Sequence, residues 1–354
     1  MTDHFDAVLL AGFGGPEGPD EVLPFLERVT AGRGIPPERL LEVGQHYLTL
    51  GGVSPINEQN RALLAAITDE LTARGIGVPV VLGNRNSVPF FADVVADLEK
   101  QGLHRVLALA TSAYSSYSGC RQYREDLWQA LDTTGLTGHV EIRKIRPYGY
   151  LDGFTAAMAD GLADALHETI ARDGSIDELH VFFTTHSIPD AMQDASGPGG
   201  TGAYLAQHRA VAERVFAQAV AGLDAAPPWS LVFQSRSGPP SMPWLEPDIN
   251  DALRETSSVG IRTVVVVPIG FISDHIEVIW DLDTQARETA ESLGLGFTRV
   301  RTAGVDPRFV SGLVDVIVAE LTATPPTLDG IWSGTCSTDC CVSARSTRDV
   351  VPGI

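Results

Sequence analysis

Short runs of consecutive apolar residues alternate along the chain with longer stretches in which apolar residues recur at helical spacing. The run Val264–Val267 is entirely β-branched, which is typical of a parallel strand buried on both faces. Similar runs predict the other strands, at residues 7–10, 80–82, 106–109, 140–142, 180–184, 229–233 and 296–300. Helices are expected between them, at residues 21–30, 37–50, 58–74, 90–101, 123–131, 151–172, 204–221, 276–287 and 307–321.

Strands and helices alternate in the same way in both halves of the chain. This order predicts an α/β fold with two similar Rossmann-like domains, each a four-stranded parallel sheet flanked by helices. We expect the first domain over residues 1–150 and the second over residues 151–324. Residues 325–354 show little periodicity and are rich in Pro, Gly, Ser, Thr and Cys, so we expect an irregular tail.

The composition excludes several classes of partner. The 354 residues carry a formal net charge of −20, which argues against binding to nucleic acid or to anionic membrane surfaces. No apolar run reaches the roughly 18–20 residues that cross a bilayer. The start of the chain lacks the shape of a signal peptide, and we expect a cytoplasmic protein without a membrane span.

A glycine-rich loop, Ala11–Pro16, follows the first predicted strand. A dinucleotide-binding loop would need a helix to begin here, and Pro16 and Pro19 disfavour that start. A loop that lets a flat ligand approach the backbone fits these residues better.

Polar residues follow the strand Val264–Val267 and begin a helix, with Ser273 or Asp274 as the expected N-cap. Acids and a histidine gather over its first two turns: Asp274, His275, Glu277 and Asp281. One interpretation is a capping box formed by Asp274 and Glu277. The other is a row of carboxylates beside a histidine, which binds a cation or carries protons.

His186 follows another predicted strand of the same half. Pro189 should prevent an immediate helix and leave His186 in a loop at the carboxyl edge of the sheet, where Glu277 also lies. A structural role is the usual one for a single histidine. A histidine and a carboxylate that face each other across a cleft are an acid–base pair or part of a metal site.

Two other loops are candidates for the walls of a ligand pocket. Residues 234–244, QSRSGPPSMPW, are polar and proline-rich, and they fit either a pocket wall or an ordinary surface turn. Tyr114, Tyr117 and Tyr123 could line the opposite wall.

The chain has four cysteines, and three of them are close together near its end: Cys120, Cys336, Cys340 and Cys341. A disulfide scaffold would be shorter and denser in cysteine. Clustered thiols are typical ligands of zinc or an iron–sulfur centre, and free thiols are the remaining alternative.

Several of these segments together resemble the ferrochelatase family, whose members insert ferrous iron into a porphyrin. The resemblance rests on LLAGFGGP at the start, GGVSPIN at 51–57, TTHSIP at 184–189, FQSRSGPPSMPWLEPDI at 233–249 and PIGFISDHIEVIWDLD at 268–283. It implies two Rossmann-like domains with the porphyrin in the cleft between them.

The resemblance implies catalytic roles for His186 and Glu277, which would also contact the Fe²⁺ substrate. His275, Asp274 and Asp281 would be secondary residues on a proton path. Gln285 stands where the family has a further acid, which would shorten that path.

The matching positions imply porphyrin contacts by five residues: Phe13, His46, Tyr47, Ser54 and Tyr123. Many bacterial members have Tyr in place of Phe13, and Phe cannot ligate iron. Arg is common where this chain has Thr30, so one contact to a propionate is in doubt.

The resemblance also implies that Cys120, Cys336, Cys340 and Cys341 hold a [2Fe–2S] cluster, although the C-x3-C-C spacing differs from that of the animal enzymes. Residues 33–54 are more polar than the membrane-docking lip of those enzymes, which favours coproporphyrin III as substrate. We therefore expect a monomeric enzyme that makes Fe-coproporphyrin III and contacts other haem-pathway enzymes only transiently. The alternatives are a protoporphyrin IX ferrochelatase, a chelatase for another tetrapyrrole or for cobalt, and a non-catalytic haem or iron–sulfur protein.

Overall fold

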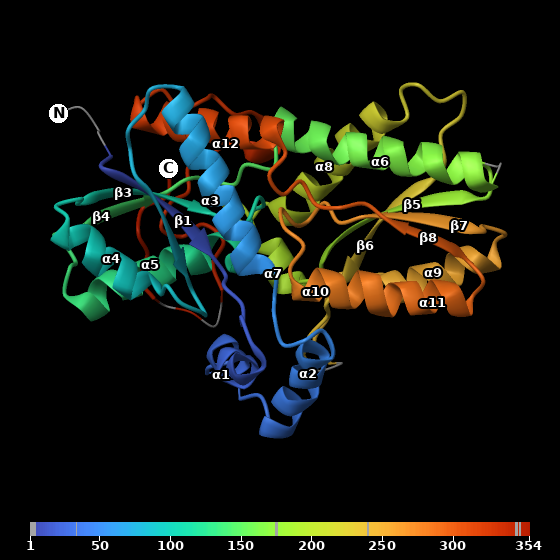
Figure 1. The fold of residues 1–354 in the computed structure, drawn as a ribbon, viewed down its shortest axis with the longest axis horizontal. Coiled ribbons are helices and arrows are strands. Elements are labelled where there is room, and N and C mark those ends of the chain that lie inside the picture. The colour runs from blue at the N-terminus through green and yellow to red at the C-terminus, as the bar shows by residue number, and fades with distance from the viewer. Residues whose placement is uncertain (1–4, 33, 174–175, 239–240, 344–345, 347) are drawn as a thin grey trace.

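The structure is a computed structural model that describes residues 5–32, 34–173, 176–238, 241–343, 346 and 348–354. Two four-stranded sheets lie side by side in it (Figure 1). The first has the order β2-β1-β3-β4 and contains β1 (Ala7–Gly12), β2 (Val80–Asn84), β3 (Arg105–Ala110) and β4 (Glu141–Lys144). The second has the order β6-β5-β7-β8 and contains β5 (Leu179–His186), β6 (Trp229–Gln234), β7 (Thr263–Val267) and β8 (Gly296–Arg299).

All neighbouring strands in both sheets run parallel. The predicted α/β fold with two four-stranded parallel sheets is therefore confirmed. Each sheet places the carboxyl ends of its strands at one edge, where ligands of open α/β folds bind. The predicted domain limits of residues 1–150 and 151–324 stay a prediction.

Helices cover both faces of each sheet (Figure 1). The first half contains α1 (Pro19–Val29), α2 (Pro37–Thr49), α3 (Ile56–Ala73), α4 (Phe91–Lys100), a π-helical turn (Tyr117–Arg121) and α5 (Gln122–Thr134). The second half contains α6 (Asp152–Asp173), α7 (Asp190–Asp194), α8 (Ala203–Ala219), α9 (Ile249–Ser258), α10 (Ile276–Val278), a π-helical segment (Ile279–Ala286), α11 (Arg287–Ser292), α12 (Pro307–Leu321) and a short 3₁₀ turn (Gly330–Trp332).

One continuous hydrophobic core joins the two sheets. It takes Leu10 and Leu109 from the first sheet and Phe183 and Val267 from the second, all of them almost fully buried. The helices α3, α6, α8 and α12 contribute much of the remainder of this core. The pair α1 and α2 projects from the body below the two sheets (Figure 1).

Two local predictions about the second half were wrong. Strand β5 runs through His186, so this residue ends a strand and does not lie in a loop. A helix does begin soon after it, because Pro189 is the N-cap of α7, a position that needs no N–H from the residue.

The acidic helix is also different from the predicted regular helix. Only Ile276–Val278 is α-helical, and Ile279–Ala286 is π-helical before α11 continues. The N-cap is His275 and not Ser273 or Asp274, and no side chain caps this end. π-Helical turns are rare and occur often at functional sites.

The tail is largely irregular, as predicted, but the body of the protein binds it closely. Lys144 of β4 donates its N–H to Pro352 and accepts one from Ile354. The buried guanidinium of Arg124 donates to the carbonyl oxygens of Val351 (2.7 Å) and Ser337 (2.9 Å). Protein contacts alone therefore hold the tail against the first sheet.

The helices that the structure describes include none with the length and apolar content needed to span a bilayer.

Candidate active site

His186 and Glu277 meet at the carboxyl edge of the second sheet. His186 is the last residue of β5, and Glu277 follows the adjacent strand β7, so parallel pairing of these strands brings both to the same edge. The distance from His186 Nε2 to Glu277 Oε2 is 3.8 Å, and both side chains are about half-buried. The predicted pair thus exists as neighbouring groups with access to a ligand.

The hydrogen bonds of His186 fix the proton on its ring. Nδ1 contacts the carbonyl oxygen of Ser187, and a carbonyl oxygen only accepts hydrogen bonds, so Nδ1 carries the hydrogen. In the neutral imidazole Nε2 then has a free lone pair. That lone pair lies on the side of Glu277 and can accept a proton or bind a metal ion.

Arg299 separates the acids of this region into two groups. Its guanidinium donates to Asp283 (2.6 and 2.7 Å) and to Asp274 (2.8 Å). Asp274 is therefore neutralised by Arg299 and does not form the capping box with Glu277. In the described ranges no Lys or Arg pairs with the carboxylates of Glu277 and Asp281, which supply the negative charge of the site.

Asp281 is held by the loop that follows β6. Its carboxylate accepts hydrogen bonds from the Ser235 hydroxyl and from Gln234 Nε2 (3.4 Å). Burial raises the pKa of Asp281 to about 6, and the negative charge of Glu277 adds to this effect. Near neutral pH this carboxyl group can both accept and release a proton.

The remaining histidine of the segment, His275, lies beside these groups. Its pKa is lowered by burial and by the proximity of His186, while Glu277 and Asp274 act in the opposite direction. A neutral His275 adds no positive charge near Glu277.

Residues of α1 and α2 cover the start of the acidic helix. Tyr47 and Ile276 are buried together, and Phe13 packs against the same cluster. His46 stacks on Trp280 with ring centroids 4.3 Å apart. Burial, together with the charges of Glu277 and Asp281, holds the pKa of Tyr47 well above its usual value, so its hydroxyl is neutral. Three of the five residues predicted to contact the porphyrin, Phe13, His46 and Tyr47, thus pack at the acidic helix.

Hydrogen bonds from two asparagine side chains hold the glycine loop in place. Asn86 Nδ2 donates to the carbonyl oxygen of Phe13 (3.1 Å), and Asn57 Nδ2 donates to that of Gly15 (2.9 Å). A Cβ atom on Gly15 would lie 2.7 Å from the Cβ of Ser54, so only glycine fits here. Ser54 is thereby placed directly against the loop.

The Arg85 side chain lies between two predicted porphyrin contacts. Its guanidinium carbon is 4.1 Å from the ring centre of Tyr123 and 5.6 Å from that of Phe13. Tyr123 is only 3% exposed, and the guanidinium covers its ring. The structure thus connects Tyr123 to Phe13 through Arg85.

Two of the tyrosines predicted to form a pocket wall have other roles. Tyr114 is buried in the main core, where its ring stacks on His208 at 3.6 Å. Tyr117 donates a hydrogen bond to Glu125 (2.9 Å) and not to the acids of the second sheet's edge. In the loop 234–244, Gln234 and Ser235 do reach Asp281, whereas Pro239 and Pro240 lie outside the described residues.

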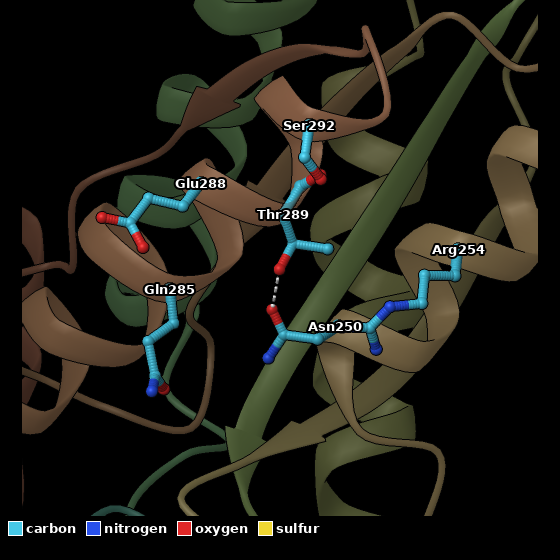
Figure 2. Close-up of a pocket in the computed structure, with 6 residues that line it drawn as sticks. All are labelled: Asn250, Arg254, Gln285, Glu288, Thr289 and Ser292. Carbon is cyan, nitrogen blue, oxygen red and sulfur yellow. Dashed lines mark hydrogen bonds between the residues drawn. The ribbon is translucent and has the colours of Figure 1, made fainter.

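A surface pocket opens between α9 and α11, at the outer end of the acidic helix (Figure 2). It is lined by Asn250, Arg254, Gln285, Glu288, Thr289 and Ser292, and Asn250 accepts a hydrogen bond from Thr289 (2.8 Å). Gln285, predicted to replace a further acid, is exposed here. Neither His186 nor Glu277 lines this pocket, so it is separate from the candidate active site.

The four cysteines gather at one place although Cys120 is far from the others in sequence. Cys120, Cys340 and Cys341 are buried together, with Cys336 packed against them. Hydrogen bonds join Cys120 to Cys336 and Cys341, and join Cys340 to the same two residues. No group of three or more His, Cys, Asp or Glu in the described ranges has the arrangement of a formed metal site. The predicted [2Fe–2S] cluster is therefore not shown.

Two buried cations lie next to these thiols. Lys144 Nζ is 3.6 Å from Cys120 Sγ, and Arg124 lies one helical turn after Cys120. Among the residues that the structure describes, neither cation pairs with a carboxylate. Hydrogen bonds from Cys336 and Cys341, together with these cations, hold the pKa of Cys120 well below its usual value. The pKa of Cys340 is lowered in the same way, whereas hydrogen bonds to Cys120 and Cys340 together with burial raise the pKa of Cys336 and Cys341. The cations thus favour anionic sulfur at Cys120 and Cys340.

Several residues of the site could not be found by reading the sequence. Arg299 and Ser235 are ordinary polar residues, and only the fold brings them to the acids. The segment 233–249, which contains Ser235, did indicate a functional role, because it carries part of the family resemblance.

Comparison with known proteins shows which family the chain resembles. A family model described as Ferrochelatase matches residues 5–321. The coproporphyrin III ferrochelatase of Leifsonia xyli subsp. xyli is 49% identical, covering 96% of this chain and 92% of that protein. The coproporphyrin III ferrochelatase of Streptomyces coelicolor is 49% identical, covering 99% of this chain and 96% of that protein. The coproporphyrin III ferrochelatase of Propionibacterium freudenreichii is 47% identical, covering 99% of this chain and 97% of that protein.

The raised pKa of Asp281 predicts a pH-dependent cost to stability. Between about pH 4 and 6 the folded protein keeps a proton on Asp281 that the unfolded chain releases, so the free energy of unfolding should fall as pH rises through this window. Asp281→Asn removes this effect, and the stability of the variant relative to wild type should rise by about 1–2 kcal/mol from pH 4 to 7. Urea unfolding across this range measures the difference. Parallel stability curves would contradict the raised pKa.

Proposed function

The chain belongs to the ferrochelatase family, and from this premise we propose how it inserts ferrous iron into coproporphyrin III to form Fe-coproporphyrin III in haem biosynthesis. It is a metal-insertion enzyme of the lyase class. In this proposal His186 and Glu277 handle the metal ion and the pyrrole protons. The observation that carries it is the free lone pair of His186 Nε2, 3.8 Å from the Glu277 carboxylate.

Metal insertion exchanges two pyrrole protons for one Fe²⁺ ion, so the site must remove protons while it attracts a cation. His186 Nε2 accepts a pyrrole proton, and the imidazolium that forms lies next to the Glu277 carboxylate. The same carboxylate favours Fe²⁺ at this edge of the sheet, because Asp274 and Asp283 are already neutralised by Arg299.

Asp281, the second unpaired acid, accepts the protons that leave the reaction site. Asp281 lies one turn beyond Glu277, and its pKa of about 6 lets it take up and release protons at physiological pH. Its contact with Ser235 leads away from His186 toward the loop after β6. Asp281 is thus the proton acceptor after Glu277, with His275 as a neutral neighbour.

The porphyrin lies between the glycine loop and the acidic helix in this proposal. Phe13 and Tyr47 supply apolar area, and Ser54 and His46 are further contacts. Tyr123, the fifth predicted contact, is buried beneath Arg85 and takes part only through that guanidinium. A pocket shaped for a buckled ring binds the transition state better than the flat substrate, since planarity opposes entry of the metal. His46 must leave Trp280 to contact the ring if the porphyrin occupies this space.

We further propose that Cys120, Cys336, Cys340 and Cys341 hold a [2Fe–2S] cluster. The support is chemical: four sulfurs meet, and within the described part of the chain the buried Lys144 and Arg124 have no carboxylate partner. An unpaired buried charge costs several kcal/mol, roughly 3–5. A cluster with four thiolates would supply a redox-active anionic centre that satisfies both cations. A zinc site of the same four ligands is the alternative.

The first test concerns His186 and Glu277. His186→Ala should abolish iron insertion while porphyrin binding persists, and Glu277→Gln should lower kcat by about 10²–10⁴-fold. Asp281→Asn should cost less, because Asp281 acts after Glu277. Anaerobic assays with Fe²⁺ and coproporphyrin III, followed by visible absorption, measure the rates, and His167→Ala on the exposed face of α6 is the control. Insertion by His186→Ala at the wild-type rate would refute the assignment.

The second test concerns the substrate. The described part of residues 34–54 is polar with a few exposed apolar side chains, among them Leu41 and Leu48, and the relatives above are coproporphyrin III ferrochelatases. We expect kcat/KM to be higher for coproporphyrin III than for protoporphyrin IX by at least about tenfold, roughly 1.4 kcal/mol in transition-state binding. A preference for protoporphyrin IX would contradict the substrate assignment.

The third test concerns the cysteines. Protein purified without oxygen should be reddish brown and contain iron and acid-labile sulfide in equal amounts. Cys120→Ser and Cys340→Ser should each remove the colour, and Ser333→Ala in the same tail should not. The tail should stay resistant to protease in both cysteine variants, because Arg124 and Lys144 anchor it independently. Colourless wild-type protein with bound zinc would show that the cluster is misassigned.

A further inference from the structure

A tyrosine on the far side of the catalytic strand is bound to His186. Tyr204 lies in the first turn of α8 and is 6% exposed. Its hydroxyl donates to the main-chain carbonyl oxygen of His186 at 2.8 Å. This contact leaves the imidazole free to face Glu277, so Tyr204 acts on the backbone that carries the ring.

Tyr204 is itself held in a buried polar network. Its oxygen is 2.7 Å from Thr185 Oγ1, which lies 2.9 Å from His208 Nε2. His208 Nδ1 contacts the carbonyl oxygen of Tyr204 (2.7 Å), so this nitrogen carries the hydrogen. Burial lowers the pKa of His208 to about 3, and the ring is neutral. The Thr185 hydroxyl therefore has one hydrogen for two acceptors, Tyr204 and His208.

The peptide between His186 and Ser187 sets the direction of the imidazole. The ring donates from Nδ1 to the carbonyl oxygen of Ser187, which belongs to the next peptide, so a rotation of the His186–Ser187 peptide moves the acceptor relative to the ring. The N–H of Ser187 donates to Gln234 (2.8 Å), and its hydroxyl donates to Leu245 (2.8 Å). Tyr204 supplies the remaining hydrogen bond, from the opposite side.

We propose that Tyr204 is a positioning residue for His186, and that the loop between α7 and α8 couples this role to the thiol of Cys341. The proposal rests on the catalytic role of His186 proposed above. It adds a residue that touches neither the porphyrin nor iron, and it gives the cysteine site a physical connection to the reaction.

The connection to the cysteines is short. Cys341 Sγ accepts the N–H of Gly197 at 3.2 Å. The neighbouring residue, Ser196, is fully buried, and its hydroxyl oxygen accepts the N–H of Tyr204 at 2.8 Å. The same hydroxyl donates to Gln193 (2.6 Å) in α7. A change at the Cys341 sulfur therefore acts on the residue pair that fixes the start of α8, where Tyr204 lies.

Tyr204→Phe tests the first part, because it removes one hydroxyl and keeps the ring. The Thr185 hydrogen then serves His208 alone, so the fold should tolerate the change. We expect kcat to fall by about 10–100-fold with KM for the porphyrin nearly constant, since misplacement of the reacting group mainly affects the transition state. Tyr148→Phe is the matched control, because Tyr148 is equally buried and donates to the carbonyl oxygen of Ala110 at 2.8 Å.

A second readout separates positioning from a general structural defect and needs no turnover. Nitrogen NMR of protein labelled with ¹⁵N-histidine reports which ring nitrogen of His186 carries the hydrogen, with His186→Ala identifying the signals. Wild type and Tyr148→Phe should show the hydrogen on Nδ1. In Tyr204→Phe the two ring nitrogens should become more alike as the other tautomer is populated. Unchanged nitrogen shifts together with unchanged kcat would overturn the proposal.

Cys341→Ala and Cys336→Ala test the coupling. Both remove one of the four thiols and would disrupt a bound metal centre equally, but only Cys341 accepts from Gly197, while Cys336 faces Gly353 in the tail. The His186 nitrogen shifts should move in Cys341→Ala and stay in place in Cys336→Ala. Equal effects would overturn the coupling through the loop. Failure of the [2Fe–2S] assignment would appear separately, as absent iron and sulfide in the wild-type protein.

Discussion

Arg299 ends strand β8 with its guanidinium between two carboxylates, Asp274 and Asp283, and its side chain is 11% exposed. This single cation fixes both the start and the middle of the acidic helix. It also determines the charge of the cleft, because two acids are neutralised and Glu277 and Asp281 are not. A site that must attract Fe²⁺ and release protons needs this uneven distribution, since a fully paired row of acids would attract no cation.

The parts of the site that lie at strand ends could be read from the sequence. Buried β-branched runs mark the strands, and parallel strands carry their polar ends to one edge, which placed His186 and Glu277 together. The π-helical segment could not be read, because apolar spacing over eight residues does not distinguish π from α turns. The contacts of Arg299, Tyr204 and Cys341 join residues distant in sequence, and nothing local distinguishes them from other buried polar residues.

The prediction of an irregular tail over residues 325–354 is correct, but it did not show what holds the tail in place. Its composition predicted an irregular segment, and in the structure Arg124 and Lys144 hold the backbone of this segment to the first sheet. The side chains of the same two residues lie next to the thiols. The Arg124 guanidinium therefore serves both the tail and the thiols, whereas Lys144 holds the tail through its main chain and approaches Cys120 with its side chain.

The core shared by the two sheets has a mechanical consequence for the reaction. Bending the sheets apart would expose Leu10, Phe183 and their buried neighbours to water. The two sheets therefore behave as a stiff frame. When a stiff body and a compliant one are pressed together, the compliant one takes up most of the deformation. With the porphyrin placed as proposed above, the compliant partner is the macrocycle, because a packed protein interior resists deformation. We therefore expect the porphyrin, and not the protein, to carry the strain that admits the metal.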